Sequence, residues 1–117
     1  MKNKNHWYDG MFYDKVIAPN QDKVFETVKV IISNDSVILD VGCGTGRMAF
    51  RLWDKYRKYT GIDLSIKNID TAKKKLCKKL SEKIEYIHAD AYTYLKGSDI
   101  KYDYAVLSYV IHEINEP

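Results

Sequence analysis

The sequence predicts an α/β protein with a mostly parallel sheet and helices on both faces. Strand-like and helix-like segments alternate along the 117 residues, and the joining segments have the length that crossover connections need. The apolar run at residues 37–39 shows no polar alternation, which is typical of a strand buried on both faces. Three glycines and a helical pattern follow that strand. Together these features predict helix layers on both sides of a parallel sheet.

Two regions are distinguished along the chain. Residues 1–20 are rich in aromatic side chains and form either a strap that covers core surface or a lid that folds over a pocket. We favour the strap, because buried aromatic side chains usually serve packing. Residues 21–117 form the α/β domain.

The elements of this domain follow from apolar periodicity. A first helix is expected over residues 21–33, with apolar residues on one side and Lys23, Glu26 and Lys29 on the other. The expected strands are residues 37–39, 59–62, 84–88 and 104–109. A second helix is expected after the glycines, from the apolar positions Met48, Ala49, Leu52, Trp53 and Tyr56. A third is expected behind an N-cap at Ser65, with its apolar positions at Ile66, Ile69, Ala72, Leu76 and Leu80. A short helical turn is expected at residues 92–95.

Composition narrows the class of protein. The hydrophobic fraction is 45% and the charged fraction 30%, as in globular domains, and no apolar run approaches the length of a membrane span. We therefore expect a cytoplasmic protein without a membrane partner. Cys43 and Cys77 fit neither a disulfide framework nor a zinc pattern, so no metal is expected. The net charge of +3 is too mild to indicate a nucleic-acid binder, and we interpret the lysine-rich helix after Ser65 as a solvated face.

The glycine-rich loop after the first expected strand is the main candidate site. Gly42, Gly44 and Gly46 let the chain turn sharply and bring bare backbone close to a ligand. The helix that follows presents unpaired N–H groups to an anionic group. A nicotinamide-binding fingerprint, G-x-G-x-x-G, would need glycine at position 47, which is Arg47. The loop therefore argues against a dehydrogenase.

Acidic residues end three of the expected strands. In an open parallel sheet, ligands bind at the carboxyl ends of the strands. Asp63, 17 positions after Gly46, suits the two hydroxyls of a ribose, and Asp90 suits an exocyclic amine such as that of adenine. Asp40 is placed either to fix the glycine loop or to meet a ligand ammonium group. Taken singly, each is more often a helix cap or a turn former.

These residues resemble the class I S-adenosylmethionine-dependent methyltransferases over residues 20–114. VILDVGCGTG at residues 37–46 resembles the first motif of that family. GIDLS at 61–65, HADA at 88–91 and YDYAVLS at 102–108 resemble the second, third and fourth motifs in order and spacing.

The resemblance implies a Rossmann-like three-layer sandwich and S-adenosyl-L-methionine as the cofactor. The glycine loop with Cys43 would pass the methionine portion, with Asp40 near its amino group. Asp63 would hold the ribose. The remaining implied contacts are Leu64 against the adenine, Asp90 and Ala91 at its edge, Ser108 and Tyr109 at the methionine end, and Tyr8 or Tyr13 closing over the cofactor.

The acceptor side is less defined by the sequence. His112 follows the fourth expected strand, where it is a candidate general base or substrate contact, although a structural or merely exposed histidine is at least as common. A full class I sheet has seven strands, and this chain has room for four. We therefore expect the N-terminal, cofactor-binding half of the fold, from a longer protein or from a chain that self-associates through the exposed edge at residues 105–107.

Two functions are consistent with these features. One is methyl transfer from S-adenosylmethionine to a small-molecule acceptor. The other is a cofactor-binding module without independent catalysis, which a partner chain or a second copy would complete.

Overall fold

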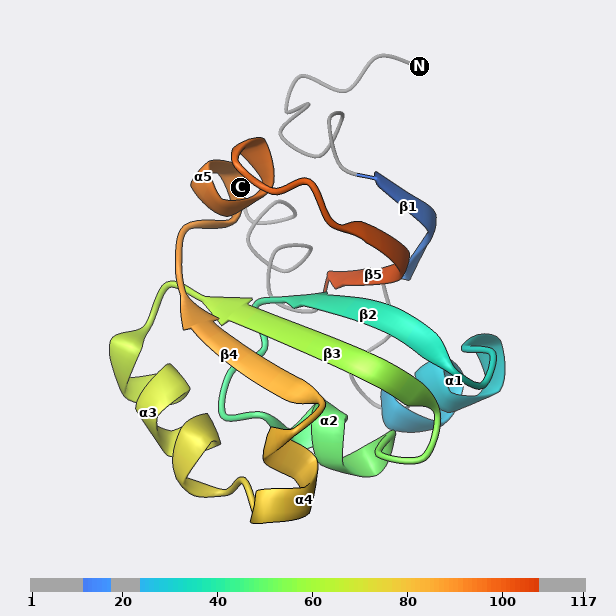
Figure 1. The fold of residues 1–117 in the computed structure, drawn as a ribbon, viewed down its shortest axis with the longest axis horizontal. Coiled ribbons are helices and arrows are strands. Elements are labelled where there is room, and N and C mark those ends of the chain that lie inside the picture. The colour runs from blue at the N-terminus through green and yellow to red at the C-terminus, as the bar shows by residue number, and fades with distance from the viewer. Residues whose placement is uncertain (1–11, 18–23, 108–117) are drawn as a thin grey trace.

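The computed structural model describes residues 12–17 and 24–107. Within them, parallel strands form one sheet in the order β1-β5-β2-β3-β4 (Figure 1). The strands are β1 Phe12–Ile17, β2 Ser36–Val41, β3 Tyr56–Asp63, β4 Ile84–His88 and β5 Lys101–Leu107. From β2 the chain moves outward through β3 to β4, and it then returns to the other side of β2 as β5. The strand order reverses between β2 and β5, which is where ligands bind in sheets of this kind.

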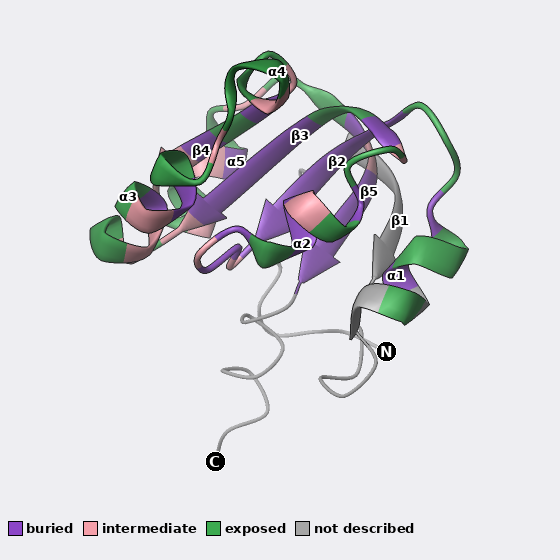
Figure 2. Cartoon of the chain, turned by 90° about the horizontal axis from the view of Figure 1, so that it is seen from below, coloured by how far each residue is buried: buried purple, intermediate pink, exposed green. Residues whose placement is uncertain are grey.

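Helices cover both faces of the sheet, as the sequence predicts. They are α1 Val24–Ile31, α2 Arg47–Arg51, α3 Ile66–Lys74, α4 Lys78–Ser81 and α5 Ala91–Lys96. Apolar residues of α1, α2, α3 and α4 pack in one core cluster on one face, and α5 packs in a second cluster on the other. Figure 2 shows the buried sheet between these layers. Among the described helices, none is both long and apolar enough to cross a membrane.

The central strand β2 explains why the core divides in two. All six of its residues are buried. Successive side chains of a strand point to opposite faces. Ile38 accordingly belongs to the cluster under α2 and α3, whereas Val37, Leu39 and Val41 belong to the cluster under α5. Asp40 lies on the same face as Ile38.

The sheet has a strand that the sequence analysis did not anticipate. Phe12–Ile17 forms β1 and pairs in parallel with β5, with Val16 opposite Ala105 and Ile17 opposite Val106. The expectation that residues 105–107 form an exposed edge is therefore wrong, because β5 is paired on both sides. The edges of the described sheet are β1 and β4.

Two expected helices are shorter than predicted. The helix after the glycine loop ends at Arg51, and Tyr56 opens β3 instead of continuing it. Tyr56 has helical spacing relative to the residues of α2 because it contacts that helix from β3. Its hydroxyl donates to the Ala49 carbonyl at 2.7 Å, which gives that carbonyl in α2 a hydrogen-bond partner.

The lysine-rich helix is divided into α3 and α4, with Cys77 extended between them. A continuous helix would place Lys74 beside Lys78 and Lys75 beside Lys79, and like charges at that spacing repel. Leu76 and Leu80 nevertheless pack against the core as expected.

Candidate functional site

The glycine loop connects β2 to α2 at the carboxyl ends of the strands. Gly42, Gly44 and Gly46 all have positive φ, at 80°, 61° and 88°. The loop is fastened to the neighbouring strand, because the Gly42 and Cys43 N–H groups both donate to the Ile62 carbonyl at 2.9 and 3.0 Å. The spacing of glycines in the sequence therefore corresponds to a real backbone requirement.

Asp63, at the end of β3, holds this loop by its side chain. Its Oδ2 accepts from the Gly44 N–H at 2.8 Å, and its Oδ1 accepts from the Ser65 N–H at 2.8 Å. An ionised carboxylate offers about four acceptor positions. Asp63 is only half-buried, so it retains capacity for further donors beside the loop.

Close packing leaves no room for side chains at two glycines. A Cβ on Gly46 would lie 2.5 Å from the Tyr86 hydroxyl, and one on Gly61 would lie 2.9 Å from the Cys43 Cβ. The Tyr86 hydroxyl, on β4, donates to the Gly46 carbonyl at 3.4 Å. The loop thus rests on the Tyr86 side chain of β4 and on the β3 backbone at Gly61.

Asp40 lies under the loop and is 1% exposed. Its Oδ2 accepts from the Tyr59 hydroxyl at 2.5 Å, whereas its Oδ1 has no hydrogen-bond partner among the residues that the structure describes. Burial raises the pKa of Asp40 from 3.8 to about 7; the Tyr59 hydrogen bond opposes this increase, and the charge of Asp63 adds to it.

Cys43 is a neutral thiol within the loop. Burial raises its pKa far above the ordinary value, and the charges of Asp40 and Asp63 raise it further. Such a thiol is not a nucleophile at neutral pH. Cys43 therefore contributes to the loop as a small buried side chain.

The third acidic strand end serves as a helix cap. Asp90 is the N-cap of α5, and its Oδ2 accepts from the Thr93 N–H at 2.9 Å and from the Thr93 hydroxyl at 3.0 Å. Ala91 packs partly buried against the second core cluster, whereas Leu64 is 63% exposed next to Asp63. An apolar side chain this exposed at the strand ends offers a surface on which a flat apolar group can pack.

Other expected site residues are not brought to the loop or are not described. Tyr13 lies on β1 opposite Tyr102, near the start of β5. With about 3.3 Å per residue, that register is roughly 17 Å from the carboxyl end of β5. Four further residues lie outside the described part of the chain: Tyr8, Ser108, Tyr109 and His112.

The structure adds three residues that the sequence analysis did not single out as site residues: Tyr59, Gly61 and Tyr86. Parallel pairing aligns Asp40 with Gly61 and Gly61 with Tyr86, and Tyr59 precedes Gly61 by two residues. All of them therefore share the face on which Asp40 lies. Only the strand register reveals this neighbourhood, since a tyrosine in a buried strand otherwise predicts packing.

Comparison with known proteins agrees with this geometry. The methyltransferase domain family matches residues 38–117. The match covers more than half of the chain, which therefore belongs to the class I, Rossmann-like methyltransferase family. No curated protein matches the chain significantly.

Solved structures share the fold. An S-adenosylmethionine-dependent methyltransferase from Thiobacillus denitrificans, in complex with S-adenosyl-L-homocysteine, is 30% identical with a TM-score of 0.59, over 75% of this chain and 36% of that one. M. capricolum TrmK, in complex with S-adenosyl-homocysteine, is 23% identical with a TM-score of 0.65, over 80% and 46%. The tRNA m1G37 methyltransferase of M. jannaschii is 23% identical with a TM-score of 0.57, over 69% and 24%. The chain spans less than half the length of each of these proteins.

Proposed function

We propose that this chain binds S-adenosyl-L-methionine and takes part in methyl transfer to a small-molecule acceptor. The observation that carries the proposal is the glycine loop, whose backbone is fastened to the Asp63 carboxylate and lies over Asp40, a buried carboxylate with one oxygen that has no partner among the described residues. A buried acceptor without a donor is costly, so the site is suited to a ligand that brings a donor. The ammonium group of a methionine moiety is such a donor.

The proposed roles divide the cofactor among the strand ends. Gly42, Gly44 and Gly46 form bare backbone against which the methionine portion packs, and Asp40 faces its ammonium group. Asp63 accepts from the ribose hydroxyls with the acceptor capacity left by Gly44 and Ser65. Leu64 covers the adenine, and Oδ1 of Asp90, the oxygen that does not accept from Thr93, accepts at its edge.

Methyl transfer then depends on alignment more than on reactive side chains. The bound cofactor supplies a methyl group already activated by the sulfonium charge. The protein holds the cofactor, excludes water and orients the acceptor for in-line displacement. Ser108, Tyr109 and His112 follow β5 in the sequence, and we propose them as acceptor-side or methionine-side contacts.

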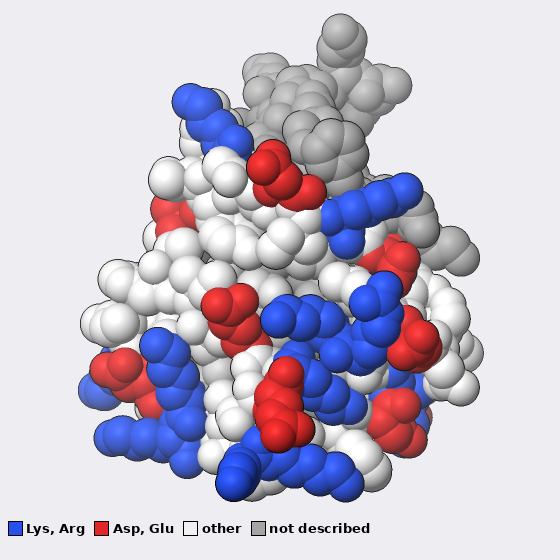
Figure 3. Space-filling view, viewed as in Figure 1, with Lys and Arg blue, Asp and Glu red and all other residues white. Residues whose placement is uncertain are grey.

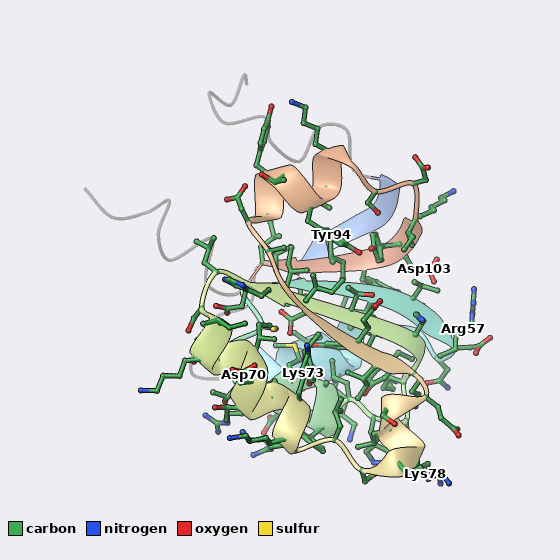
Figure 4. All side chains as sticks on the ribbon, turned by 60° about the vertical axis from the view of Figure 1, so that its left-hand side comes forward. Arg57, Asp70, Lys73, Lys78, Tyr94 and Asp103 are labelled. Atoms are coloured by element: carbon green, nitrogen blue, oxygen red, sulfur yellow. The ribbon has the colours of Figure 1, made fainter. Side chains whose placement is uncertain are left out.

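The distribution of charge favours a small acceptor over a nucleic acid. Figure 3 shows Lys and Arg over the α3 and α4 region, interleaved with acidic residues. In Figure 4, Lys73 and Lys78 extend outward from α3 and α4, with Asp70 nearby. Such interleaved charge, with a net charge of only +3, does not form the continuous basic surface on which nucleic-acid binding depends.

A cofactor-binding module without independent catalysis is the second candidate. The observation that favours it is the coverage, because the chain spans only 36% of the methyltransferase to which it is 30% identical. In this case a partner chain or a second copy would complete the acceptor site. Cofactor turnover by the 117-residue chain with a panel of small acceptors would exclude the module.

Calorimetry with S-adenosylmethionine and S-adenosylhomocysteine tests the premise that both functions share. We expect Asp63→Ala to lose about 1.5–3 kcal/mol of affinity for both ligands, because hydrogen bonds to a charged acceptor are removed. Absence of binding to the unaltered chain would contradict both functions, and unchanged affinity in the variant would contradict the ribose role.

Asp103→Ala is the matched control for this experiment. The Asp103 Oδ2 accepts from the Val37 N–H at 2.8 Å, so it too is a carboxylate that fastens β2 backbone. It lies at the amino end of the sheet, away from the loop (Figure 4). We expect its loss to lower the free energy of unfolding without changing cofactor affinity.

A further inference from the structure

Tyr59 and Asp40 form a buried, hydrogen-bonded pair in the core. Tyr59 is fully buried and Asp40 is 1% exposed, and the tyrosine hydroxyl donates a 2.5 Å hydrogen bond to Oδ2 of Asp40. The residue directly opposite Asp40 is Gly61, and Tyr59 lies two residues earlier on the same face of β3. The contact between Tyr59 and Asp40 is therefore a diagonal one between neighbouring strands.

The groups that the structure describes around the pair are acidic, neutral or apolar. Asp40 interacts electrostatically with Asp63 of β3, with Tyr86 of β4 and with Cys43 of the loop. On β5 the opposite residue is Val106. The buried residues of α2 and α3 in this cluster are apolar: Met48, Ala49, Ile69 and Ala72. Arg47 and Arg51 of α2 are exposed.

Among the described residues, only one carboxylate oxygen of Asp40 therefore has a hydrogen-bond donor. Oδ2 has the Tyr59 donor, and Oδ1 has none among the described residues. A hydrogen bond to the charged form of a carboxylate favours that form. Tyr59 thus has two effects on Asp40: it fixes the orientation of the side chain, and it opposes protonation in a buried position.

We propose that Tyr59 is a positioning residue, which holds Asp40 as a carboxylate with Oδ1 free to accept the ammonium group of the methionine moiety. This inference rests on the proposed function. It goes beyond it by assigning a role to a tyrosine of β3 that acts through the Asp40 side chain. Cofactor affinity then depends on the protonation of a buried pair below the loop.

The direction of the pH dependence follows from the pair. The pKa of Asp40 is raised to about 7, so the ionised fraction decreases as the pH falls through neutrality. Without the Tyr59 hydroxyl the pKa would rise further, and affinity for an ammonium-bearing ligand would fall at a higher pH. The affinity ratio between Tyr59→Phe and the unaltered chain should therefore be large in weak acid and approach one in base.

The experiment measures dissociation constants of S-adenosylhomocysteine from pH 6 to pH 9 for the 117-residue chain and for Tyr59→Phe. We expect binding to Tyr59→Phe to be about tenfold weaker at pH 6.5, since one pKa unit corresponds to a factor of ten, and nearly equal at pH 9. The ligand's own amine titrates equally in both proteins, so it cancels in the ratio. A ratio that is the same at every pH would overturn the proposal.

Two controls separate positioning from general loss of structure. Tyr56→Phe removes a buried hydroxyl from the same strand, but that hydroxyl donates to the Ala49 carbonyl and not to Asp40, so its affinity ratio should stay near one. The second control uses 5′-methylthioadenosine, which lacks the amino-acid portion; Tyr59→Phe should bind it with unchanged affinity at every pH. Weakening of both ligands by the same factor would overturn the proposal.

Asp40→Asn keeps the test decisive if Tyr59→Phe does not fold. We expect this variant to bind S-adenosylhomocysteine more weakly, with a dissociation constant that changes little between pH 6 and pH 8. A decrease in affinity with falling pH that persists in Asp40→Asn would assign the titration to another group and overturn the proposal. If neither ligand binds the unaltered chain, the proposed function itself fails.

Discussion

Gly46 is subject to two independent constraints. Its φ of 88° is strained for any residue with a side chain, and a Cβ there would lie 2.5 Å from the Tyr86 hydroxyl and 3.1 Å from the Ala72 Cβ. We expect Gly46→Ala to lower the free energy of unfolding by about 2–4 kcal/mol, the sum of backbone strain and overpacking. Urea denaturation followed by circular dichroism measures this loss.

Gly97 provides the matched control for that substitution. It ends α5 with φ −99°, and the nearest atom to an added Cβ would be the Thr93 carbonyl oxygen at 3.9 Å. The free energy of unfolding of Gly97→Ala should therefore differ from that of the unaltered chain by no more than about 0.5 kcal/mol. Equal losses at the two glycines would mean that the loop does not require its left-handed conformation.

One tyrosine of β5 joins the end of α1 to the sheet by hydrogen bonds, in addition to apolar packing. The Tyr104 hydroxyl accepts from the Ser33 N–H at 3.1 Å, contacts the Ser33 hydroxyl at 2.6 Å and donates to the Ile31 carbonyl at 3.4 Å. We expect Tyr104→Phe to destabilise the chain by about 1–2 kcal/mol, because groups at the end of α1 lose their partner. Thermal or urea unfolding measures the change.

A tyrosine on the surface serves as the reference for this prediction. Tyr92 of α5 is 52% exposed, and Lys96 lies over its ring. Removing its hydroxyl leaves that contact in place, so Tyr92→Phe should be nearly neutral. If Tyr104→Phe is equally neutral, α1 is held by its apolar residues alone.

The packing of α5 on the opposite face also involves a tyrosine hydroxyl of β5. The Tyr94 and Tyr102 hydroxyls lie 3.0 Å apart, so that a half-buried helix residue meets a fully buried strand residue (Figure 4). Burial and this contact raise the pKa of Tyr102 well above its ordinary value. Each helix layer is thus joined to β5 by a tyrosine hydroxyl as well as by apolar contact.

The edge strand β1 determines how much of the sheet is available for pairing. Removal of residues 1–17 would expose the β5 backbone along the apolar residues 105–107, and such an edge pairs readily with other chains. We expect this truncated chain to associate in a concentration-dependent manner. Light scattering after size-exclusion chromatography measures the association, with the intact chain as control. A truncated chain that remains monomeric, with unchanged stability, would show that β1 does not protect this edge.

Sequence patterns predicted the sheet centre and the loop well. The apolar run at residues 37–39, the three glycines and the acidic strand ends are local signals, and each corresponds to a constraint that the structure exhibits, such as positive φ or the Asp63 contact to Gly44. The family match and the parallel, two-faced sheet confirm the predicted fold class. The ligand contacts of these residues stay predictions.

The features that were missed depend on residues distant in the chain. β1 is short and mixed in composition, so only its pairing with β5 identifies it as a strand. Tyr56 has helical spacing because it contacts α2 from a strand. In the sequence Tyr59 looks like any aromatic residue of a buried strand, and only its hydrogen bond to Asp40 in the structure distinguishes it. The β1–β5 and Tyr59–Asp40 relations are not local, and the seven-residue contact from Tyr56 to Ala49 imitates helical spacing, so periodicity could not reveal them.

The pairing of β1 with β5 also has a consequence for the order in which the chain folds. Phe12 pairs with Lys101, so this ladder closes a loop of almost the whole described chain, whereas β2, β3 and β4 follow one another and pair in sequence. Closing a long loop costs more entropy than closing a short one, and non-local strand pairs form slowly. During synthesis β1 is made before the other described strands and has no partner among them until β5 emerges. Of the described strands, the first to leave the ribosome is therefore the last to join the sheet.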